Sequence, residues 1–288
     1  MSKQKIQSSL IGYLFAAPFI LFAAIFILYP MIKGVYNSFF DFRFGKISFV
    51  GIENYMKVFT DDIYLLSIKN SLLYTVTVVP LLIIFGIFIS GSIFDKLPGY
   101  VSFVRICLYI PVIASLVVMS IIWRFMLDSQ SGLLRYIYDL INMRPVNLLG
   151  DANWTFTILV LILFAVDIGQ CVVLYIANMI GIPKDIIEAL EIDGGNRYHL
   201  FRYILIPFCR PTTLFVFITQ TAAVIRVFVV IQLLTNGGPN HSSTSMMYLL
   251  YQEGFANGNF GSASALGVVM FFFSVLLVLV QFKAIKQK

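Results

Sequence analysis

Only two residues that carry a charge at neutral pH lie deep inside the long apolar runs of this chain, Asp167 and Arg226. A charge buried among apolar side chains costs free energy unless it is paired, so both residues indicate a specific role. Gln170 follows Asp167 by three residues and lies on nearly the same face of a helix. A second stripe of small and polar side chains at helical spacing consists of Thr219, Ala223 and Arg226, with Gln220 beside it. These groups could hydrogen-bond a polar solute or hold two helices together.

Asp167 and Arg226 allow three interpretations. Counted from the outer ends of their apolar runs, the two positions differ in depth by five residues, which is about 7.5 Å along a helix. A long arginine side chain can span that offset, so the pair could form a structural lock between two helices. Alternatively, both residues contact a transported ligand, or they meet a partner chain.

Other kinds of chemistry are poorly represented in the sequence. Two histidines and three cysteines cannot form a disulfide framework or a ligand-rich metal site. The chain contains no Gly-x-x-x-x-Gly-Lys-Ser/Thr motif, so it lacks a phosphate-binding loop of its own. The scattered carboxylates form no catalytic cluster, which argues against a membrane enzyme. We therefore expect no metal, no resident cofactor and no catalytic residue in this chain.

The composition identifies the environment in which these residues act. Hydrophobic residues make up 59% of the 288 positions and charged residues only 12%, about half the charged share of a soluble domain. So few charges cannot cover a soluble globule, and a chain with 28 phenylalanines has ample apolar surface to bury. The sequence therefore predicts an integral membrane protein, whose net charge of +6 marks topology and not nucleic-acid binding.

Six apolar runs are long enough to cross a bilayer, which takes about 20 residues of helix. They cover residues 10–32, 70–91, 106–123, 155–177, 207–233 and 262–282. Consecutive apolar residues exclude the alternating pattern of barrel strands, so we expect an all-α membrane protein with six transmembrane helices. The first run is longer than a signal-peptide core and is expected to be retained. No repeat or linker divides the chain, so residues 1–288 are expected to form a single membrane domain.

Lysine and arginine residues in the connections predict the orientation, because cytoplasmic loops are enriched in them. With both termini cytoplasmic, the inner connections hold eleven basic and five acidic residues, a surplus of six. The outer connections then hold eight of each sign. The opposite orientation would place the whole surplus outside. Both termini are therefore expected on the cytoplasmic side, with one long inner connection at residues 178–206.

The inner connection at residues 178–206 has the pattern of two short helices joined by a turn. Pro183 suits the first turn of a helix. An apolar stripe at helical spacing follows and consists of Ile186, Ile187, Ala189 and Leu190. Gly194 and Gly195 can take the left-handed conformation that ends a helix. The simplest interpretation is an amphipathic segment that rests on lipid headgroups.

The spacing within this connection resembles the signature of the permease subunits of binding-protein-dependent ABC importers. That signature is Glu-Ala-Ala, three residues, Gly, nine residues and Ile-x-Leu-Pro. The matching positions are Glu188, Ala189, Gly194, Ile204 and Pro207, with Asp193 before the glycine. Leu190 replaces the second alanine and Ile206 replaces the leucine, and both replacements are apolar.

Three further segments resemble the sugar-importing, maltose-type members, and within them the first of two permeases. They are Phe49-Val-Gly-Ile-Glu-Asn-Tyr55, Thr235-Asn-Gly-Gly-Pro-Asn240, which contains Gly237, Gly238 and Pro239, and Gly261-Ser-Ala-Ser-Ala265. The resemblance implies a type I ABC importer permease with a cytoplasmic coupling helix, in the cytoplasmic membrane of a bacterium or archaeon. It implies as partners a second permease, an ABC ATPase dimer that binds ATP and Mg²⁺, an extracellular binding protein and membrane lipid.

The resemblance also implies roles for individual residues. For coupling to the ATPase these are Ile186, Ile187, Glu188, Ala189, Leu190, Asp193 and Gly194. For the pathway of a sugar they are Phe164, Asp167, Gln170, Thr219, Gln220, Ala223 and Arg226, with Phe228 as a second ring for stacking. The alternative substrate is glycerol phosphate or an acidic sugar, for which Arg226 would be a ligand. A self-sufficient secondary transporter is a further alternative, although related halves or helices broken at the midplane are not evident.

Overall fold

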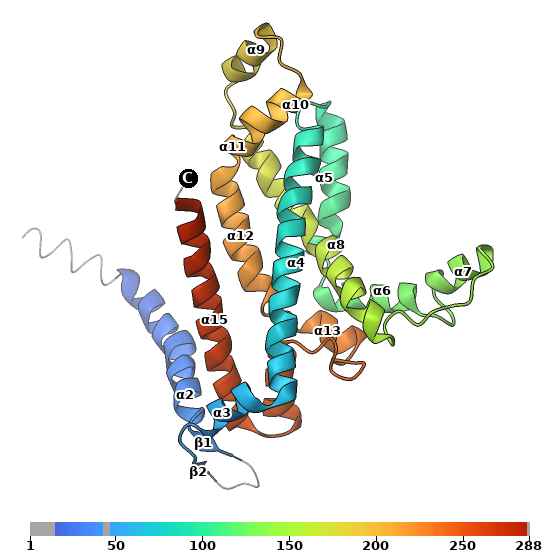
Figure 1. Ribbon diagram of the computed structural model, residues 1–288. Helices are drawn as coiled ribbons and strands as arrows, with labels where there is room; N and C mark the ends of the chain where they lie inside the picture. Colours follow the sequence, from blue (N-terminus) through green and yellow to red (C-terminus); the bar gives the residue numbers. More distant parts are fainter. Residues whose placement is uncertain (1–14, 43–46, 287–288) are drawn as a thin grey trace, which may run out of the picture. The chain divides into compact units, whose positions relative to one another are not determined.

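The computed structural model describes residues 15–42 and 47–286, so residues 10–14 of the first predicted span lie outside the described residues. The described chain is predominantly α-helical (Figure 1). It also contains a short antiparallel pair of strands, β1 (Phe40–Asp41) and β2 (Ser48–Phe49), which the sequence did not predict. The chain divides into two compact units. One contains the residues up to Asp61 and Leu250–Phe271, and the other contains Asp62–Leu249 and the residues from Phe272 onward.

The smaller unit is built around one apolar helix and a polar cluster. Its elements are the helix Phe15–Asn37, which includes η1 (Ala24–Leu28) and α2 (Tyr29–Asn37), then β1, β2, α3 (Glu53–Thr60), η4 (Gln252–Ala256) and the first part of α15 (Phe260–Lys286). The turns labelled η are π-helical. In the helix Phe15–Asn37 the most apolar stretch has no buried residue, as expected of a surface that faces lipid.

Asn54 holds the smaller unit together. Its Nδ2 donates to the carbonyl oxygens of Ser38 and Phe40 at 2.9 and 3.0 Å, and its Oδ1 accepts from Ser262 Oγ at 3.1 Å. Gly261 allows this approach, because a Cβ there would overlap the carbonyl oxygen of Phe40. Two of the segments that resemble sugar importers, residues 49–55 and 261–265, therefore contact each other.

The larger unit contains the remaining helices. In chain order these are α4 (Asp62–Ile93), α5 (Pro98–Ile113), α6 (Leu116–Leu127), α7 (Leu133–Leu140), α8 (Ala152–Met179), α9 (Lys184–Ile192), α10 (Arg197–His199), η3 (Leu200–Leu205), α11 (Ile206–Phe208), α12 (Arg210–Val224), α13 (Val229–Leu234) and α14 (Met246–Tyr251), followed by the second part of α15. α14 begins in this unit and ends in the smaller one.

The core of the larger unit lies between α4 and α8. Tyr74 and Leu82 of α4 and Tyr175 of α8 are fully buried there. Close helix packing depends on two glycines. A Cβ at Gly86 would lie 3.0 Å from the Tyr175 ring, and a Cβ at Gly169 of α8 would overlap the backbone of α5. Small residues at such contacts let helices approach in the way that membrane helices commonly do.

The described helices match four of the six predicted spans well. Four helices are long and apolar enough to cross a membrane, or up to six if each of two bent helix pairs is one span. The four are Phe15–Asn37, Asp62–Ile93, Ala152–Met179 and Phe260–Lys283. They overlap the predicted runs at 10–32, 70–91, 155–177 and 262–282.

The other two predicted runs are not continuous helices. Residues 106–123 belong to α5 and α6, which meet at an angle of 99°. A new helix starts there because Ser115 caps α6, its Oγ accepting from the backbone N–H of Val117. Within 207–233, α12 ends at Val224 and α13 starts only at Val229. Apolar composition predicts the length of a run in a membrane, but it does not reveal where the backbone turns inside that run.

Candidate functional site

The predicted helix–turn–helix is present in the connection between α8 and α12. α9 ends at a turn in which Gly194 takes the left-handed conformation, with φ of +76°, as its sequence position indicated. The N–H groups of Gly194 and Gly195 donate to the carbonyl oxygens of Glu191 and Leu190 at 3.0 and 2.8 Å. These bonds satisfy carbonyls that the end of a helix would otherwise leave without partners. The turn therefore fixes the direction in which the chain leaves α9.

The side chains of α9 differ in their exposure. Ile187 packs against the core of the larger unit, and Leu190 is half-buried against the turn at Gly195. Ile186 is 46% exposed and Glu188 is exposed, and because they are two positions apart they point to different sides of the helix. Ala189, Asp193 and Gly194 are exposed as well. Of the residues predicted to couple to an ATPase, Ile187 and Leu190 thus contact this chain itself, and the others present a mixed apolar and acidic surface.

The segment after the turn is fixed at its start by a reciprocal cap. The Asn196 side chain accepts from the backbone N–H of His199 at 3.1 Å, and His199 Nδ1 accepts from the Asn196 N–H at 3.2 Å. Each side chain thus satisfies a backbone donor that the helix itself leaves free. His199, which the sequence left without a clear role, acts here as a helix cap.

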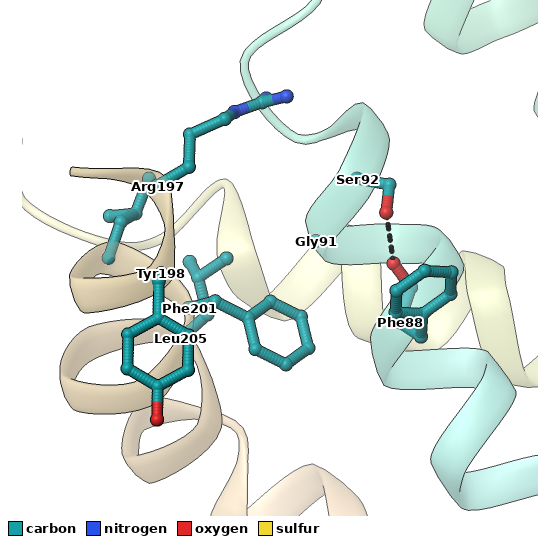
Figure 2. A pocket seen from close by; sticks show the side chains of 8 residues that line it. Phe88, Gly91, Ser92, Arg197, Tyr198, Phe201 and Leu205 are labelled. Carbon is teal, nitrogen blue, oxygen red and sulfur yellow. Dashed lines mark hydrogen bonds between the residues drawn. The ribbon is translucent and has the colours of Figure 1, made fainter.

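The segment α10–η3 also packs on the end of α4. Arg197 forms an ion pair with Asp95, which follows α4. Figure 2 shows the Phe201 ring beside Gly91 of α4, with Leu205 close by. A Cβ at Gly91 would lie 2.6 Å from the Phe201 ring, so the ring occupies the space that any larger residue would fill. A groove of about 260 Å³ remains open next to this contact, lined by Phe88, Ser92 and Tyr198 among others.

The Gly-Gly-Pro loop lies at the opposite end of α4 and is closely hydrogen-bonded. Gly237 has φ of +77°, and the Gly238–Pro239 peptide bond is cis. Thr244 Oγ1 donates to the carbonyl oxygen of Gly237 at 3.1 Å, and Ser243 Oγ donates to that of Gly238 at 2.7 Å. The predicted residues Gly237, Gly238 and Pro239 therefore form a loop whose backbone is satisfied largely by its own side chains.

Asn70, Ser71 and Tyr74 of α4 anchor this loop, and sequence reasoning missed all three. Asn70 Nδ2 lies 3.0 and 3.1 Å from the carbonyl oxygens of Ser242 and Thr244. Ser71 Oγ accepts from a loop N–H at 2.8 Å, and the Tyr74 hydroxyl donates to a loop carbonyl at 3.3 Å. The three side chains are buried. The sequence did contain a signal for this role: three side chains with polar groups lie close together at the start of the apolar run 70–91.

A polar pocket of about 410 Å³ lies next to the Gly-Gly-Pro loop. It is lined by Arg124, Asp128, Gln130, Asn147, Thr235, Gly238 and Pro239, with other residues of the same segments. Arg124 Nη1 donates to the carbonyl oxygen of Leu233 at 3.2 Å, which connects α6 to α13. Backbone N–H groups of Ser131 and Gln130 hydrogen-bond Asp128 and lower the pKa of its carboxyl. This pocket therefore keeps both a positive and a negative side chain at neutral pH.

The predicted pathway residues on α8 and near α12 do not form the ion pair that a lock requires. Arg226 is exposed, and its Nε donates to the carbonyl oxygen of Ala222 at 2.7 Å. Asp167 is half-buried on α8 and forms no ion pair within the described part of the chain. The lock between the two residues is therefore not formed in this structure, although it was one of the sequence-based interpretations.

The other predicted pathway residues differ in their surroundings. Gln220 is buried, and its Oε1 has no hydrogen-bond partner in the described chain. Thr219 Oγ1 donates to a carbonyl of its own helix at 2.8 Å, while Ala223 and Gln170 are exposed. Phe164 packs edge-on against Phe85 of α4, with 5.4 Å between the ring centroids. Phe228 stacks on Tyr248 at 6.5 Å. The structure places all of these residues in the larger unit.

Known proteins resemble this chain over nearly its whole length, although no protein-family model matches it. The osmoprotective compounds uptake permease protein GgtC of Synechocystis sp. is 31% identical over 279 residues, which are 95% of this chain and 98% of the relative. The arabinooligosaccharides transport system permease protein AraP of Bacillus subtilis is 28% identical over 94% of this chain and 87% of the relative. The sn-glycerol-3-phosphate transport system permease protein UgpA of Agrobacterium fabrum is 28% identical over 98% and 96%.

A solved structure has the same fold. The crystal structure of a bacterial ABC transporter involved in the import of the acidic polysaccharide alginate matches with a TM-score of 0.87, over 99% of this chain and 98% of that chain, at 20% identity. The apolar helices and the helix–turn–helix at α9 thus belong to a multi-pass membrane permease. The chain is a member of the ABC transporter permease family. It is therefore a transport component, and the alternative of a self-sufficient secondary transporter no longer applies.

Proposed function

We propose that this chain is one of two permease subunits of an ATP-driven importer that takes up a sugar or oligosaccharide. An extracellular binding protein delivers the substrate, and a dimeric ABC ATPase on the cytoplasmic side binds ATP and Mg²⁺. The whole chain, residues 1–288, acts as one permease domain in the cytoplasmic membrane of a bacterium or archaeon. The relatives named as transport permeases and the signature at residues 188–207 support this assignment.

The proposed topology has six membrane spans and both termini in the cytoplasm. The bent pair α5 with α6 then counts as one span, and in the second bent pair the part from residue 207 onward, which includes α12, forms the fifth span. The surplus of basic residues in the inner connections supports placing these connections and both termini in the cytoplasm. Gln281 of α15 donates to Thr221 of α12 at 2.7 Å, so these two helices run side by side, and within the larger unit the C-terminal end of α15 lies toward α9 (Figure 1). A cytoplasmic C-terminus and a cytoplasmic α9 are therefore mutually consistent.

The exposed surface of α9 is the observation that carries the proposal. Ile186 is 46% exposed and Glu188 is exposed, on a short helix that is fixed by its turn. Full burial of an isoleucine side chain in a cleft of the ATPase would contribute about 1.5–3 kcal/mol. A charge-assisted hydrogen bond from the ATPase to Glu188 would contribute about 1.5–3 kcal/mol more. A rigid helix with such a surface can transmit the closure of the ATPase dimer to the membrane helices.

The substrate pathway is proposed to run along α8 and α12. Asp167, Gln170, Thr219, Gln220 and Arg226 would hydrogen-bond the substrate, with Phe164 or Phe228 stacking on a sugar ring and Ala223 leaving room for it. The Oε1 atom of Gln220, buried without a partner, is an acceptor suited to a hydroxyl group. The name of AraP favours an oligosaccharide, while that of UgpA keeps glycerol phosphate as the second candidate. This second candidate is anionic, and the exposed guanidinium of Arg226 has no acidic partner in the described chain, so it could bind such a substrate.

Reconstitution of the transporter tests the coupling role. The chain is co-expressed with its second permease and its ATPase, and ATP hydrolysis stimulated by the binding protein is measured in lipid nanodiscs. Glu188→Ala is expected to abolish most of the stimulation while the permease still inserts. Glu53→Ala is the matched control, since Glu53 is an exposed glutamate on α3 in the other unit. Wild-type stimulation in Glu188→Ala combined with Ile186→Asp would refute the proposed coupling surface.

Binding measurements decide the substrate class. The binding protein is titrated with neutral oligosaccharides, acidic oligosaccharides and glycerol 3-phosphate, and the tightest ligand is then used in uptake assays. If the substrate is anionic, Arg226→Met is expected to lower uptake strongly, whereas a neutral sugar should be affected less. Binding of none of these three classes would contradict a sugar or phosphate importer.

A further inference from the structure

α4 contacts both of the regions that are expected to move during transport. It spans 32 residues, Asp62–Ile93, which corresponds to about 48 Å of helix. Its C-terminal end lies against the segment that follows α9, and Asn70 near its N-terminal end hydrogen-bonds the Gly-Gly-Pro loop (Figure 1). α12 and α13 also join the two regions along the chain, whereas α4 joins them through side-chain contacts.

The contact near α9 is steric and specific. The ring of Phe201 rests on Gly91, where even a methyl group would come within 2.6 Å of it. Leu205 is buried beside the ring, and its Cδ1 would lie 3.3 Å from the same added methyl group. The Asp95–Arg197 ion pair joins the same two segments (Figure 2 shows Arg197 extending away from the ring). A displacement of the segment α10–η3, which follows α9 and its turn, therefore presses directly on α4.

The contact at the other end is made of hydrogen bonds. Asn70 holds the carbonyl oxygens of Ser242 and Thr244, and the Asn70 side chain is 5% exposed. Ser71 accepts from the N–H of Met246 at 2.8 Å. Buried bonds of this kind are costly to leave unmade, so the loop follows the end of α4 when that end moves.

The middle of α4 is stiff enough to connect its ends. Pro80 removes one backbone hydrogen bond, which would normally favour a kink. The helix nevertheless continues through Pro80, because Val78, Val79 and Leu82 around it are buried against the core with α8. The two packed helices can therefore shift together as one body.

We infer that α4 transmits movement of α9 to the Gly-Gly-Pro loop, with Gly91 and Asn70 as the positioning residues at its two ends. The inference rests on the proposed function, since it takes the ATPase as the source of the movement of α9. It adds that the loop beside the polar pocket, on the proposed outer face, responds to the ATPase through α4. The state of the nucleotide is thus communicated to the side where the binding protein docks.

Hydrogen–deuterium exchange on the assembled transporter tests this inference. Exchange of the amides of residues 236–246 is compared between the nucleotide-free complex and the complex trapped with ATP and vanadate. The wild type is expected to show a clear difference in the loop between these two states. Gly91→Val, which displaces Phe201, is expected to lose that difference, and Gly91→Val with Phe201→Ala should recover it. Gly99→Val is the matched control, because a Cβ at Gly99 meets no atom within 4 Å.

A second site and an independent readout complete the test. Asn70→Leu should lose the difference in the loop at the other end of α4, and it replaces Gly91→Val if that variant does not assemble. Exchange in α9 itself reports docking on the ATPase. If α9 stays protected and the loop in Gly91→Val and Asn70→Leu still responds as in the wild type, transmission through α4 is refuted and the proposed function stands. If α9 gains no protection in the wild-type complex, α9 does not dock on the ATPase, and the proposed function itself is refuted. An unchanged loop in the wild type would also overturn the inference.

Discussion

The two ends of α4 meet regions that are built in opposite ways. The backbone of the Gly-Gly-Pro loop is satisfied by hydrogen bonds from its own Ser243 and Thr244 and from Asn70 of α4. The α9 region leaves Ile186 and Glu188 exposed and is joined to α4 by a ring contact and a surface ion pair. A closed polar network gives a loop one fixed shape, whereas the exposed side chains of α9 are available to a partner. This contrast indicates that the Gly-Gly-Pro loop has one fixed conformation, whereas α9 is the region that contacts a partner.

The largest effect is expected from Asn70→Leu. Leucine keeps the branching of the side chain but leaves the carbonyl oxygens of Ser242 and Thr244 without the Asn70 donor. Each unsatisfied group costs about 1–3 kcal/mol, so the unfolding free energy should fall by about 3 kcal/mol. Thermal unfolding of the purified permease in detergent measures this loss. Asn153→Leu, at an exposed asparagine of α8, is the control, and an equal loss in both variants would contradict the role given to the network.

Two glycines with nearly the same backbone conformation compare the regions directly. Gly237 and Gly194 have φ of +77° and +76°, so alanine is strained at both, by about 1–2 kcal/mol. A Cβ at Gly237 would also lie 2.6 Å from Thr244 Oγ1, whereas a Cβ at Gly194 meets nothing within 4 Å. Gly237→Ala should therefore destabilise the permease by about 1–3 kcal/mol more than Gly194→Ala. Melting temperatures of the two variants measure this difference. Equal values would show that the loop around Gly237 can accommodate a methyl group.

Ile186→Asp separates stability from association. Because Ile186 is 46% exposed in the permease alone, the melting temperature of the isolated chain should hardly change. Binding to the ATPase should weaken by about 1.5–3 kcal/mol, which is roughly a tenfold to hundredfold rise in Kd. Titration of the ATPase on permease in nanodiscs measures Kd. Ile52→Asp, at an exposed isoleucine of the other unit, should bind normally, and a similar loss there would mean that α9 is not the binding surface.

The smallest effect concerns the ion pair between Asp95 and Arg197. Both side chains are about half exposed, so Asp95→Asn should cost only about 0.2–1 kcal/mol, and less at high salt. The charge exchange Asp95→Arg with Arg197→Asp should restore most of that loss. Melting curves at low and high salt test this. A loss as large as that of Asn70→Leu would show that the α9 region is fixed by electrostatics after all, and the contrast between the two ends would disappear.

Parts of the candidate site were predictable from short-range rules. The left-handed turn at Gly194 follows from two adjacent glycines after an amphipathic stretch, and the four continuous helices follow from the length of their apolar runs. The bend at Ser115 and the end of α12 at Val224 did not follow, because the length and mean hydropathy of an apolar run carry no information on where its backbone turns. The missing ion pair between Asp167 and Arg226 could not be predicted either, since helix depth gives no information about the direction of a side chain.

By itself, the sequence determined that the protein is embedded in a membrane, where its long helices lie and that a helix–turn–helix follows α8. These properties depend on composition and on neighbours along the chain. Only the tertiary structure decided that Ile187 packs inward while Ile186 stays exposed, and that Asn70 holds a loop more than 170 positions away. It also decided that Gly91 receives the ring of Phe201. Such contacts join residues far apart in sequence, and their geometry is fixed only when the helices pack against one another.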